Sequence, residues 1–494
     1  MKRILCLFLA LLLFVLPFAA CSESGENSDV QDDGTGNAPQ PGAAEPEETE
    51  PEETELSDNL PDVKYEGYTF TAVTFSEGIA VEEITGEALN DALFERDKAV
   101  EERFDIALAA AQFDDYGQAT EAVKRAVNAG LDDYDCGMLH MVSAAGAAQG
   151  GFFYSLDLLD AVDPTKPWWD TDCVDAFTVA GHMKLLCGMM LPKAMLRSSC
   201  MLFNKNRFTE SGMEYPYGMV DEGTWTLDAL YELTKDTTRD LNGDGVIKEM
   251  DDFWGLTQWY LDSPYSFYYG AGGRIVTKDA DGVPILNDNL ELNSAIYDKI
   301  YKIVIDNNSN YHTDIGTYTN SYEVFTQGRA FFVEASLLHL RDDRFRDMED
   351  DYGVLPMPKY NELQERYMSF VNGAVAMLVV PSVCPNPERT GILLEGIAAE
   401  SYRHVYDALF EVTAKAKSSR DPESTRMMDL VMACRVFDLG YSHMYDQAGV
   451  QFVRDLLVQK STDIASYTTR AFKPMAKMLQ KIVEAYEKSN EAQQ

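Results

Sequence analysis

A segment of twelve residues carries oxygen-bearing side chains at the spacing of a calcium-binding loop. Gly245 stands at position 6, where such loops turn sharply. Position 12 is aspartate, which lacks the bidentate reach of the usual glutamate. We predict a structural Ca²⁺ that braces the loop, with an ion-free turn as the alternative. The ligands would come from Asp240, Asn242, Asp244, Val246 and Asp251.

A second segment concentrates aromatic side chains that could hold a ligand by their faces. Seven aromatic residues occur between Trp254 and Tyr269. Tyrosine and tryptophan supply large, rigid contact surfaces at a low cost in conformational entropy, and their faces suit the apolar C–H faces of sugar rings. Packing in a domain core is the alternative. The candidate ligand contacts are Trp259, Tyr265, Tyr268 and Tyr269.

Three further residues have side chains that suit ligand binding. Glu334 follows the apolar stretch 330–333, and a buried acid is costly unless it is paired or used. Trp168 and Trp169 stand together in a loop next to Pro167. We expect all three to contact a ligand, and for the two tryptophans a purely structural wedge is the alternative.

Motifs that would indicate an enzyme are absent from the sequence. It contains no Gly-x-Ser-x-Gly elbow, no His-Glu-x-x-His pair and no phosphate-binding glycine-rich loop, and its six histidines are scattered. We therefore expect no catalytic residues and no required cofactor. A surface glycoside hydrolase is the less favoured alternative, because carboxylates are abundant.

The first residues have the pattern of an export signal. Lys2 and Arg3 precede an apolar run, residues 4–18, which is too short for the roughly 20 residues of a membrane-spanning helix. Ala19, Ala20 and Cys21 follow, and the sequence resembles a bacterial lipobox. We predict a lipoprotein signal peptide over residues 1–20 and lipidation of Cys21, with ordinary cleavage as the alternative.

The next segment, residues 21–63, is predicted to be an acidic, disordered tether. A Glu-Pro-Glu-Glu-Thr unit occurs twice in tandem, and large apolar residues are scarce. Such a composition buries too little apolar surface to offset its ordering entropy. The chain carries 41 basic and 82 acidic residues, a net charge of −41, which argues against nucleic acid and against direct binding to anionic lipid.

Strand and helix patterns alternate after the tether, which predicts parallel β-α-β units. In such sheets ligands bind beyond the carboxyl ends of the strands. Phe75, Ser76 and His140 stand at or near the carboxyl ends of predicted strands and are therefore candidate ligand contacts. The expected elements are strands over 68–75, 106–111, 135–142, 199–203 and 330–333, and helices over 89–104, 116–128 and 290–306, a helix capped by Thr226, and a last helix with an apolar stripe from Met475 to Tyr486.

Four stretches in the same order along the chain resemble bacterial extracellular solute-binding proteins of family 1, the group that includes maltose-binding protein. Together they cover most of the chain after Tyr65. They are Arg96–Ile106, Leu202–Asn206 with Thr224–Thr226, Phe325–Phe332, and Tyr352–Pro358.

The resemblance implies an α/β periplasmic-binding-protein type II fold, with two lobes, a hinge and a ligand cleft between the lobes. The first lobe would comprise residues 64–195 and 369–415, and the second 196–368 and 416–494. Crossings between them are expected near 191–199, 369–375 and 413–421.

The resemblance also implies a function. The protein would be a monomeric lipoprotein on the extracytoplasmic face of the membrane, anchored only by its lipid. It would capture a small solute and deliver it to the permease subunits of an ABC importer. A sugar or oligosaccharide is favoured, and a peptide, a polyol or a phosphorylated solute is the alternative. A sensory receptor that presents its closed form to a membrane signalling partner is the alternative.

Overall fold

The computed structural model describes residues 56–491 except 249, 261, 314–318, 410–421 and 448, and also residue 493. The predicted signal peptide, Cys21 and most of the predicted tether lie outside these residues. The compact folded unit starts at Ser57, earlier than the predicted tether boundary. The reason is an ion pair: Asp58 is buried, and its carboxylate accepts from the Arg103 guanidinium at 2.5 and 3.0 Å.

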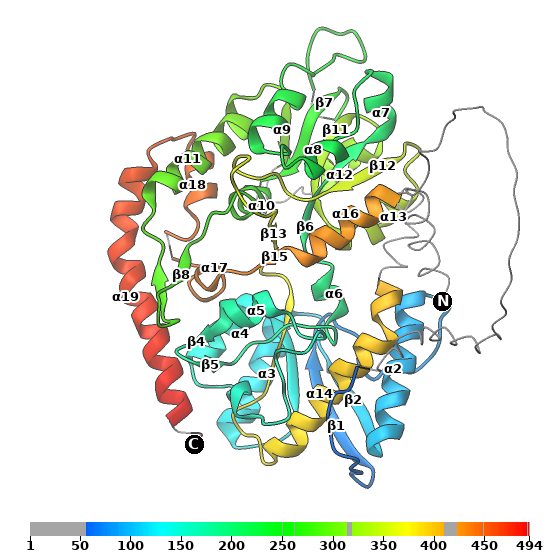
Figure 1. Cartoon of the computed structure of the whole chain (residues 1–494), viewed down its shortest axis with the longest axis vertical. Helices are drawn as coiled ribbons and strands as arrows, with labels where there is room; N and C mark the ends of the chain where they lie inside the picture. The colour runs from blue at the N-terminus through cyan, green and yellow to red at the C-terminus, as the bar shows by residue number, and fades with distance from the viewer. Residues whose placement is uncertain are drawn as a thin grey trace, which may run out of the picture. The chain divides into compact units, whose positions relative to one another are not determined.

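The first lobe is built on a four-stranded sheet with the order β14-β3-β1-β2, of which Figure 1 labels β1 and β2. β1 runs parallel to β2 and β3, and β14 is antiparallel to β3. Helices α2 and α3 connect these parallel strands, as the alternation of patterns predicts. The elements are β1 (Tyr68–Thr74), α2 (Ala88–Phe104), β2 (Ile106–Gln112), α3 (Tyr116–Ala129), β3 (Cys136–His140) and β14 (Ala376–Val379).

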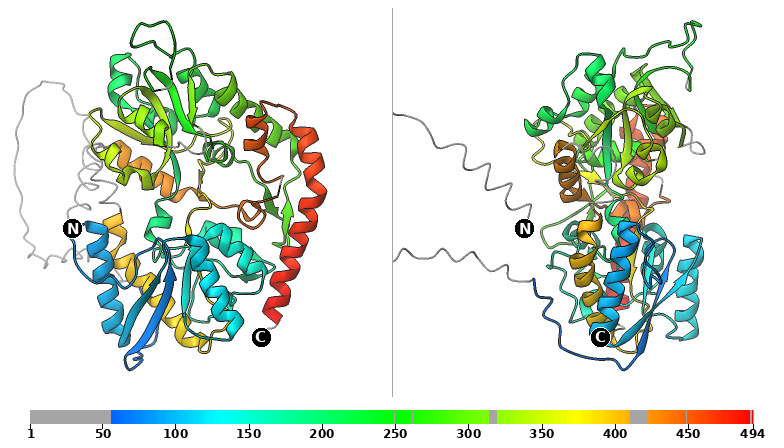
Figure 2. Two further views of the ribbon diagram at one scale, coloured as in Figure 1. Left: turned by 180° about the vertical axis from the view of Figure 1, so that it is seen from behind. Right: turned by 90° about the vertical axis from the view of Figure 1, so that its right-hand side faces the viewer.

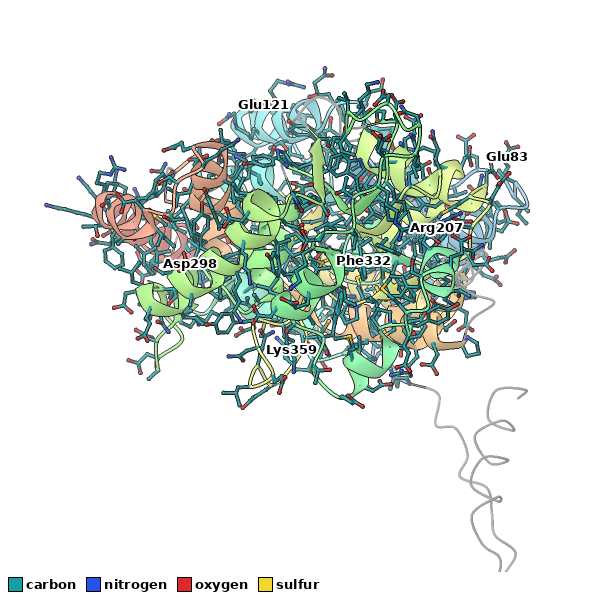
Figure 3. All side chains as sticks on the ribbon, turned by 90° about the horizontal axis from the view of Figure 1, so that it is seen from above. Glu83, Glu121, Arg207, Asp298, Phe332 and Lys359 are labelled. Atoms are coloured by element: carbon teal, nitrogen blue, oxygen red, sulfur yellow. The ribbon has the colours of Figure 1, made fainter. Side chains whose placement is uncertain are left out.

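The second lobe is built on a five-stranded sheet with the order β10-β7-β11-β6-β12. β10, β7 and β11 are parallel, and β6 pairs antiparallel with both β11 and β12. The central strands β11 and β6 are buried along their whole length, so both of their faces are covered. Phe332 lies among the interior side chains of this lobe in Figure 3. The strands are β6 (Ser199–Asn204), β7 (Trp254–Trp259), β10 (Asn310–Thr313), β11 (Ala330–Ser336) and β12 (Tyr352–Leu355).

Shorter elements complete the two lobes. Thr226 caps α9 as predicted, since its hydroxyl accepts from the Ala229 amide at 3.3 Å. The elements are α4 (Met141–Gln149), η1 (Leu156–Leu158), α5 (Thr171–Phe177), β4 (Thr178–Val179), β5 (His182–Met183), α6 (Pro192–Met195), α7 (Lys205–Glu210), α8 (Tyr217–Asp221), α9 (Leu227–Thr234), α10 (Ser263–Gly270), β8 (Val276–Lys278), β9 (Pro284–Leu286), α11 (Leu290–Tyr301), η2 (Lys302–Asp306), α12 (Thr319–Thr326), η3 (Leu337–Arg341), α13 (Asp343–Arg346), α14 (Pro387–His404), α16 (Pro422–Ala433), α17 (Leu439–His443), α18 (Phe452–Val458) and α19 (Ile464–Glu491).

Three segments pair with one another between the two sheets, and we call them the crossing segments. β13 (Ser369–Phe370) pairs in parallel with β15 (Arg435–Val436), and Ser198 bridges to Val371. Figures 1 and 2 show the two sheets on either side of these segments. The segments at 198 and 369–371 fall where crossings were predicted, whereas the one at 435–436 was not predicted. The predicted crossing at 413–421 lies outside the described residues.

The C-terminal region contacts both lobes, although the sequence assigned residues 416–494 to the second lobe alone. α17 packs against α4 of the first lobe, and α19 packs against β9 and α11 of the second lobe and against α4 and β5 of the first (Figure 2). The physical reason is the length of α19. Its predicted apolar stripe is buried at Met475, Leu479, Ile482 and Tyr486 and is long enough to cover both.

The predicted ligand contacts Trp168 and Trp169 lie in a buried cluster of the first lobe. Their indole N–H groups donate to the two carboxylate oxygens of Glu395 on α14, each at 2.9 Å. Burial raises the pKa of Glu395 to about 7, although the two indole donors act in the opposite direction. These contacts account for both tryptophans as a structural wedge between a loop and α14.

Replacing this carboxylate should destabilise the fold. Glu395→Ala leaves two buried indole N–H groups without acceptors, so we expect the free energy of unfolding to fall by about 2–4 kcal/mol. Urea unfolding measures the change. Glu95→Ala, at an exposed position of α2, is the matched control and should change it by less than about 0.5 kcal/mol. Equal effects of the two variants would contradict this role for Glu395.

Candidate functional site

A small cavity of about 20 Å³ lies where strands of the second lobe end beside the crossing segments. It adjoins the carboxyl ends of β7 and β11 and the start of β6, which is the edge where ligands bind in open α/β sheets. Its volume suffices for roughly one water molecule, so a larger ligand requires the lining residues to move apart. The lining residues are Arg197, Ser199, Trp259, Asp262, Ser266, Tyr322, Glu334, Ala335, Ser336, His339, Phe370 and Asn372.

Glu334 is a buried carboxyl group in the wall of this cavity. It is 5 % exposed, and one oxygen accepts from the Ser263 hydroxyl at 2.7 Å. Burial raises the pKa of Glu334 to about 8; the hydroxyls of Ser263 and Ser266 lower it, and the charge of Asp262 raises it further. The carboxyl group is therefore mostly protonated at neutral pH and can donate a hydrogen bond to a ligand.

Asp262 supplies a second carboxyl group, at the start of α10. One of its oxygens accepts from the Asn372 side-chain amide at 3.2 Å, which joins the second lobe to the chain just after β13. Burial raises the pKa of Asp262 to about 6, and the charges of Arg197 and Arg454 oppose this shift. Asp262 is therefore mostly ionised at neutral pH and can accept hydrogen bonds from a ligand.

The positive charge of Arg197 influences titratable groups of both lobes. Its charge acts on His140 of the first lobe and on Asp262 and His339 of the second. Burial, followed by this charge, lowers the pKa of each histidine to about 4. Both imidazoles are therefore neutral at pH 7. His339 accepts from the Ser336 amide at 3.0 Å through Nδ1, which leaves Nε2–H as its donor.

The first lobe presents three ring side chains at the carboxyl edge of its sheet. His140 stacks on Tyr116 with 4.3 Å between ring centroids and meets Phe75 edge-on at 6.2 Å. Tyr116 is 48 % exposed and so offers a face to a ligand. The Ser76 carbonyl accepts from the Lys193 ammonium. The predicted contacts Phe75, Ser76 and His140 thus lie together at this edge, as expected for residues at strand ends.

The structure separates the members of the predicted aromatic cluster. Trp259 lines the cavity, but the tyrosines of α10 are buried in the core and do not line it. Tyr265 packs edge-on against Tyr441 at 5.3 Å, and Tyr269 stacks on Phe370 at 4.5 Å. The Tyr268 hydroxyl donates to the Asn293 side chain at 2.9 Å. These tyrosines join α10 to its neighbours, which is the packing alternative considered from the sequence.

Several site residues were not predicted from the sequence. Arg197, Asp262, His339 and Asn372 line the cavity, and Tyr116 borders the first-lobe edge. The same strand-end rule that selected His140 could have selected Asp262, which follows β7. Arg197 and Asn372 stand within or beside predicted crossings, and no local pattern distinguishes them.

In the predicted calcium loop, the side-chain oxygens accept hydrogen bonds from backbone amides of the same loop. Asp240 accepts from the amides of Gly243 and Gly245 at 2.7 and 2.8 Å, and Asp244 accepts from the Val246 amide at 2.9 Å. Asn242 accepts from the Asp244 amide at 2.9 Å.

Asp252 closes the loop, although Asp251 was the predicted ligand. The buried Asp252 accepts from the amides of Leu241 and Lys248 at 2.9 and 2.7 Å. In the part of the chain that the structure describes, no group of three or more His, Cys, Asp or Glu residues is arranged to hold a metal ion. The oxygen-rich donors at positions 1, 3 and 5 are nevertheless of the kind that Ca²⁺ prefers.

Comparison with known proteins identifies the fold. No family model matches the chain, and no curated protein matches it. Among solved structures, an ABC substrate-binding protein from Listeria monocytogenes in complex with cycloalternan is 14 % identical, with a TM-score of 0.51 over 86 % of this chain and 99 % of that one. An ABC transporter solute-binding protein from Thermotoga lettingae bound with α-D-tagatose is 17 % identical, with a TM-score of 0.50 over 84 % and 100 %.

A third solved structure, UgpB from Mycobacterium tuberculosis in complex with glycerophosphocholine, is 16 % identical, with a TM-score of 0.54 over 85 % of this chain and 98 % of that one. At such identities the likeness concerns the fold. This chain shares the fold of these ABC solute-binding proteins, which confirms the predicted fold class.

The protonated state of Glu334 predicts a pH dependence of stability. The folded protein holds this proton with a pKa of about 8, against 4.5 as the ordinary value, so unfolding releases a proton between these pH values. The contribution to stability is fully present below pH 4.5 and is lost as the pH rises through 8. Relative to Glu334→Gln, the wild-type free energy of unfolding should fall between pH 5 and 8, by at most about 1.4 kcal/mol per pH unit.

Urea unfolding at four pH values measures this difference, and Glu95→Gln is the exposed control. A wild-type curve parallel to that of Glu334→Gln would show that the buried carboxyl group is ionised.

Proposed function

We propose that this protein is the extracytoplasmic solute-binding component of an ABC importer and is not an enzyme. The cavity beside the crossing segments carries the proposal. Its walls come from the second lobe and the crossing segments, and Arg197 acts electrostatically on groups of both lobes. A solute that contacts both lobes would favour the closed form by its differential affinity, which is how a two-lobed receptor captures a ligand. The shared fold supports the same function.

The chemistry of the cavity favours an uncharged, polyhydroxylated solute, such as a sugar or oligosaccharide. At neutral pH the positive charge of Arg197 acts on the negative charge of Asp262, while Glu334 is mostly protonated and His339 is neutral. These groups offer donors and acceptors without a net charge. Trp259 adds an aromatic side chain of the kind that stacks on sugar rings.

Two carboxyl groups with different pKa values also occur in glycoside hydrolases, where one acts as the acid. We favour binding over hydrolysis because the shared fold is that of ABC solute-binding proteins. The bound sugar should therefore be recovered unchanged.

The proposal includes a lipid anchor and a membrane partner. Cys21 would carry the lipid, and the acidic tether would let the folded unit reach the permease subunits of the importer. The described residues contain no helix that combines the length and apolar character needed to span a bilayer. We propose a monomer that is attached to the membrane only through Cys21, and the strongly negative charge argues against nucleic acid as a partner.

We also propose that the loop from Asp240 to Asp251 takes up Ca²⁺ as a structural ion. Side-chain oxygens at positions 1, 3 and 5 support this, together with the positive φ of 78° at Gly245, which lets the chain turn at position 6. The ion would brace this exposed loop of the second lobe and would take no part in solute capture.

Solute capture is tested with a panel of sugars and oligosaccharides by isothermal titration calorimetry. We expect at least one of them to bind. Asp262→Asn should weaken that binding about tenfold or more, because it removes a charged acceptor inside the cavity. Asp347→Asn, at an exposed position of the same lobe, is the matched control and should bind as the wild type does.

Chromatography of the bound sugar after prolonged incubation checks for turnover. Hydrolysis of the sugar would contradict the proposal, as would equal affinities of the Asp262→Asn and Asp347→Asn variants.

Calcium uptake is tested by thermal unfolding with Ca²⁺ and with a chelator. A ligand at 100 times its dissociation constant stabilises the folded state by about 2.7 kcal/mol, so the melting temperature should rise in Ca²⁺. The double variant Asp240→Asn, Asp244→Asn should show no rise in melting temperature with Ca²⁺. The control variant Asp347→Asn should show the same rise as the wild type. A melting temperature that does not respond to Ca²⁺ in the wild type would establish the ion-free turn.

A further inference from the structure

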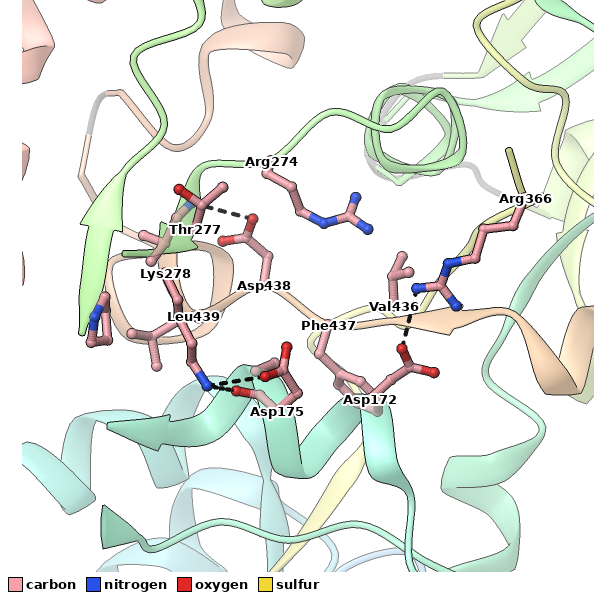
Figure 4. A pocket seen from close by; sticks show the side chains of 13 residues that line it. Asp172, Asp175, Arg274, Thr277, Lys278, Arg366, Val436, Phe437, Asp438 and Leu439 are labelled. Atoms are coloured by element: carbon pink, nitrogen blue, oxygen red, sulfur yellow. Dashed lines mark hydrogen bonds and ion pairs between the residues drawn. The ribbon is translucent and has the colours of Figure 1, made fainter. Parts of the chain in front are cut away.

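A second and larger cavity, of about 280 Å³, lies between the lobes and shares no lining residue with the candidate site. Its walls come from α5 of the first lobe, from β8 and its flanking residues in the second lobe, and from the segment 436–439, which begins at the last residue of β15 (Figure 4). The proposed capture of a solute at the candidate site does not involve this cavity.

Two arginine side chains converge in this cavity. Figure 4 shows the guanidinium groups of Arg274 and Arg366 directed into the space beside Val436 and Phe437. Arg366 contacts Asp172 of α5 at 3.3 Å, with its side chain 50 % exposed. This convergence stands out in a chain with twice as many acidic as basic residues, 82 against 41.

The charge of Arg274 is not paired with a carboxylate. Its Nη1 donates to the Gly273 carbonyl at 2.6 Å and its Nη2 to the Met368 sulfur at 3.2 Å, and no described carboxylate lies within ion-pair distance of its guanidinium. Asp438 lines the same cavity, but its two oxygens already accept from backbone amides, those of Ile275 and Gly440 each at 2.7 Å. The guanidinium has five N–H donors, more than these neutral acceptors use, and is therefore available to an anion.

We propose that this cavity is a binding site for a small anion that carries a carboxylate or phosphate group, held by Arg274 and Arg366. The planar guanidinium presents a fork of N–H donors that matches both groups in bidentate geometry. The cavity is large enough for an anion with several non-hydrogen atoms besides the charged group. Val436 and Phe437 would contact the apolar part of such an anion.

The position of the site links anion binding to the lobes. Two ion pairs cross from the second lobe to α5 of the first at its rim, Arg366 with Asp172 and Lys278 with Asp175, each at 3.3 Å. An anion bound to Arg366 competes with Asp172 for the same guanidinium. Occupancy of the site therefore weakens one contact between the lobes and biases their arrangement, and by linkage the arrangement of the lobes alters anion affinity.

The site is tested by titrating the protein with inorganic phosphate and with succinate by isothermal titration calorimetry, with sodium chloride as the ionic-strength control. We expect one of the two anions to bind beyond the chloride response, and which one binds identifies the preferred charged group. Arg274→Gln and Arg366→Gln should each weaken that binding about tenfold or more. Arg125→Gln, on the exposed face of α3, is the matched control and should leave it unchanged.

The Arg366 side chain is half exposed, so we expect Arg366→Gln to fold. This variant therefore tests the site even if Arg274→Gln does not fold. Asp262→Asn should retain anion binding while it weakens sugar binding, which separates this site from the proposed function. The inference is wrong when neither anion binds beyond the chloride response, or when the Arg366→Gln variant binds the anion as tightly as Arg125→Gln does.

Discussion

The pairing of the crossing segments is the constraint on which the rest of the structure depends. β13 pairs with β15, and Ser198 bridges to Val371, so three stretches far apart in the chain meet between the two sheets. Both cavities are built against them, since Phe370 lines the candidate site and Val436 lines the second cavity. The crossing segments contribute residues to two cavities with different lining side chains. The same pair of lobes can therefore have two sites that suit different ligands.

Burial, more than ion pairing, sets the charge of the candidate site. It raises the pKa of Glu334 and lowers those of His140 and His339, so three titratable groups are mostly neutral at pH 7. The remaining charges, Arg197 and Asp262, oppose each other. The second cavity differs, because Arg274 has carbonyl acceptors and no carboxylate partner among the described residues. The first environment suits uncharged polar solutes, and the second suits anions.

Local sequence patterns predicted the helices and strands well. They did not predict which aromatic residues line the cavity and which pack in the core. Alternating strands and helices, the cap at Thr226 and the apolar stripe of α19 all occur where they were expected. Aromatic density alone could not separate Trp259, which lines the cavity, from Tyr269, which stacks on Phe370. The difference depends on where residue 370 lies in space, and no spacing within residues 254–269 contains that information.

The sequence by itself therefore determined which segments are strands and helices, and which residues stand at their ends, because periodicity, capping and apolar runs act over a few residues. It also carried the resemblance from which the two-lobed fold was expected. Only the tertiary structure decided which strand ends meet. Arg197, Asp262 and Asn372 gather at one cavity, and Arg274 and Arg366 at another, because the crossing segments pair across long stretches of chain. Such pairing depends on the packing of the whole unit, and local sequence does not specify it.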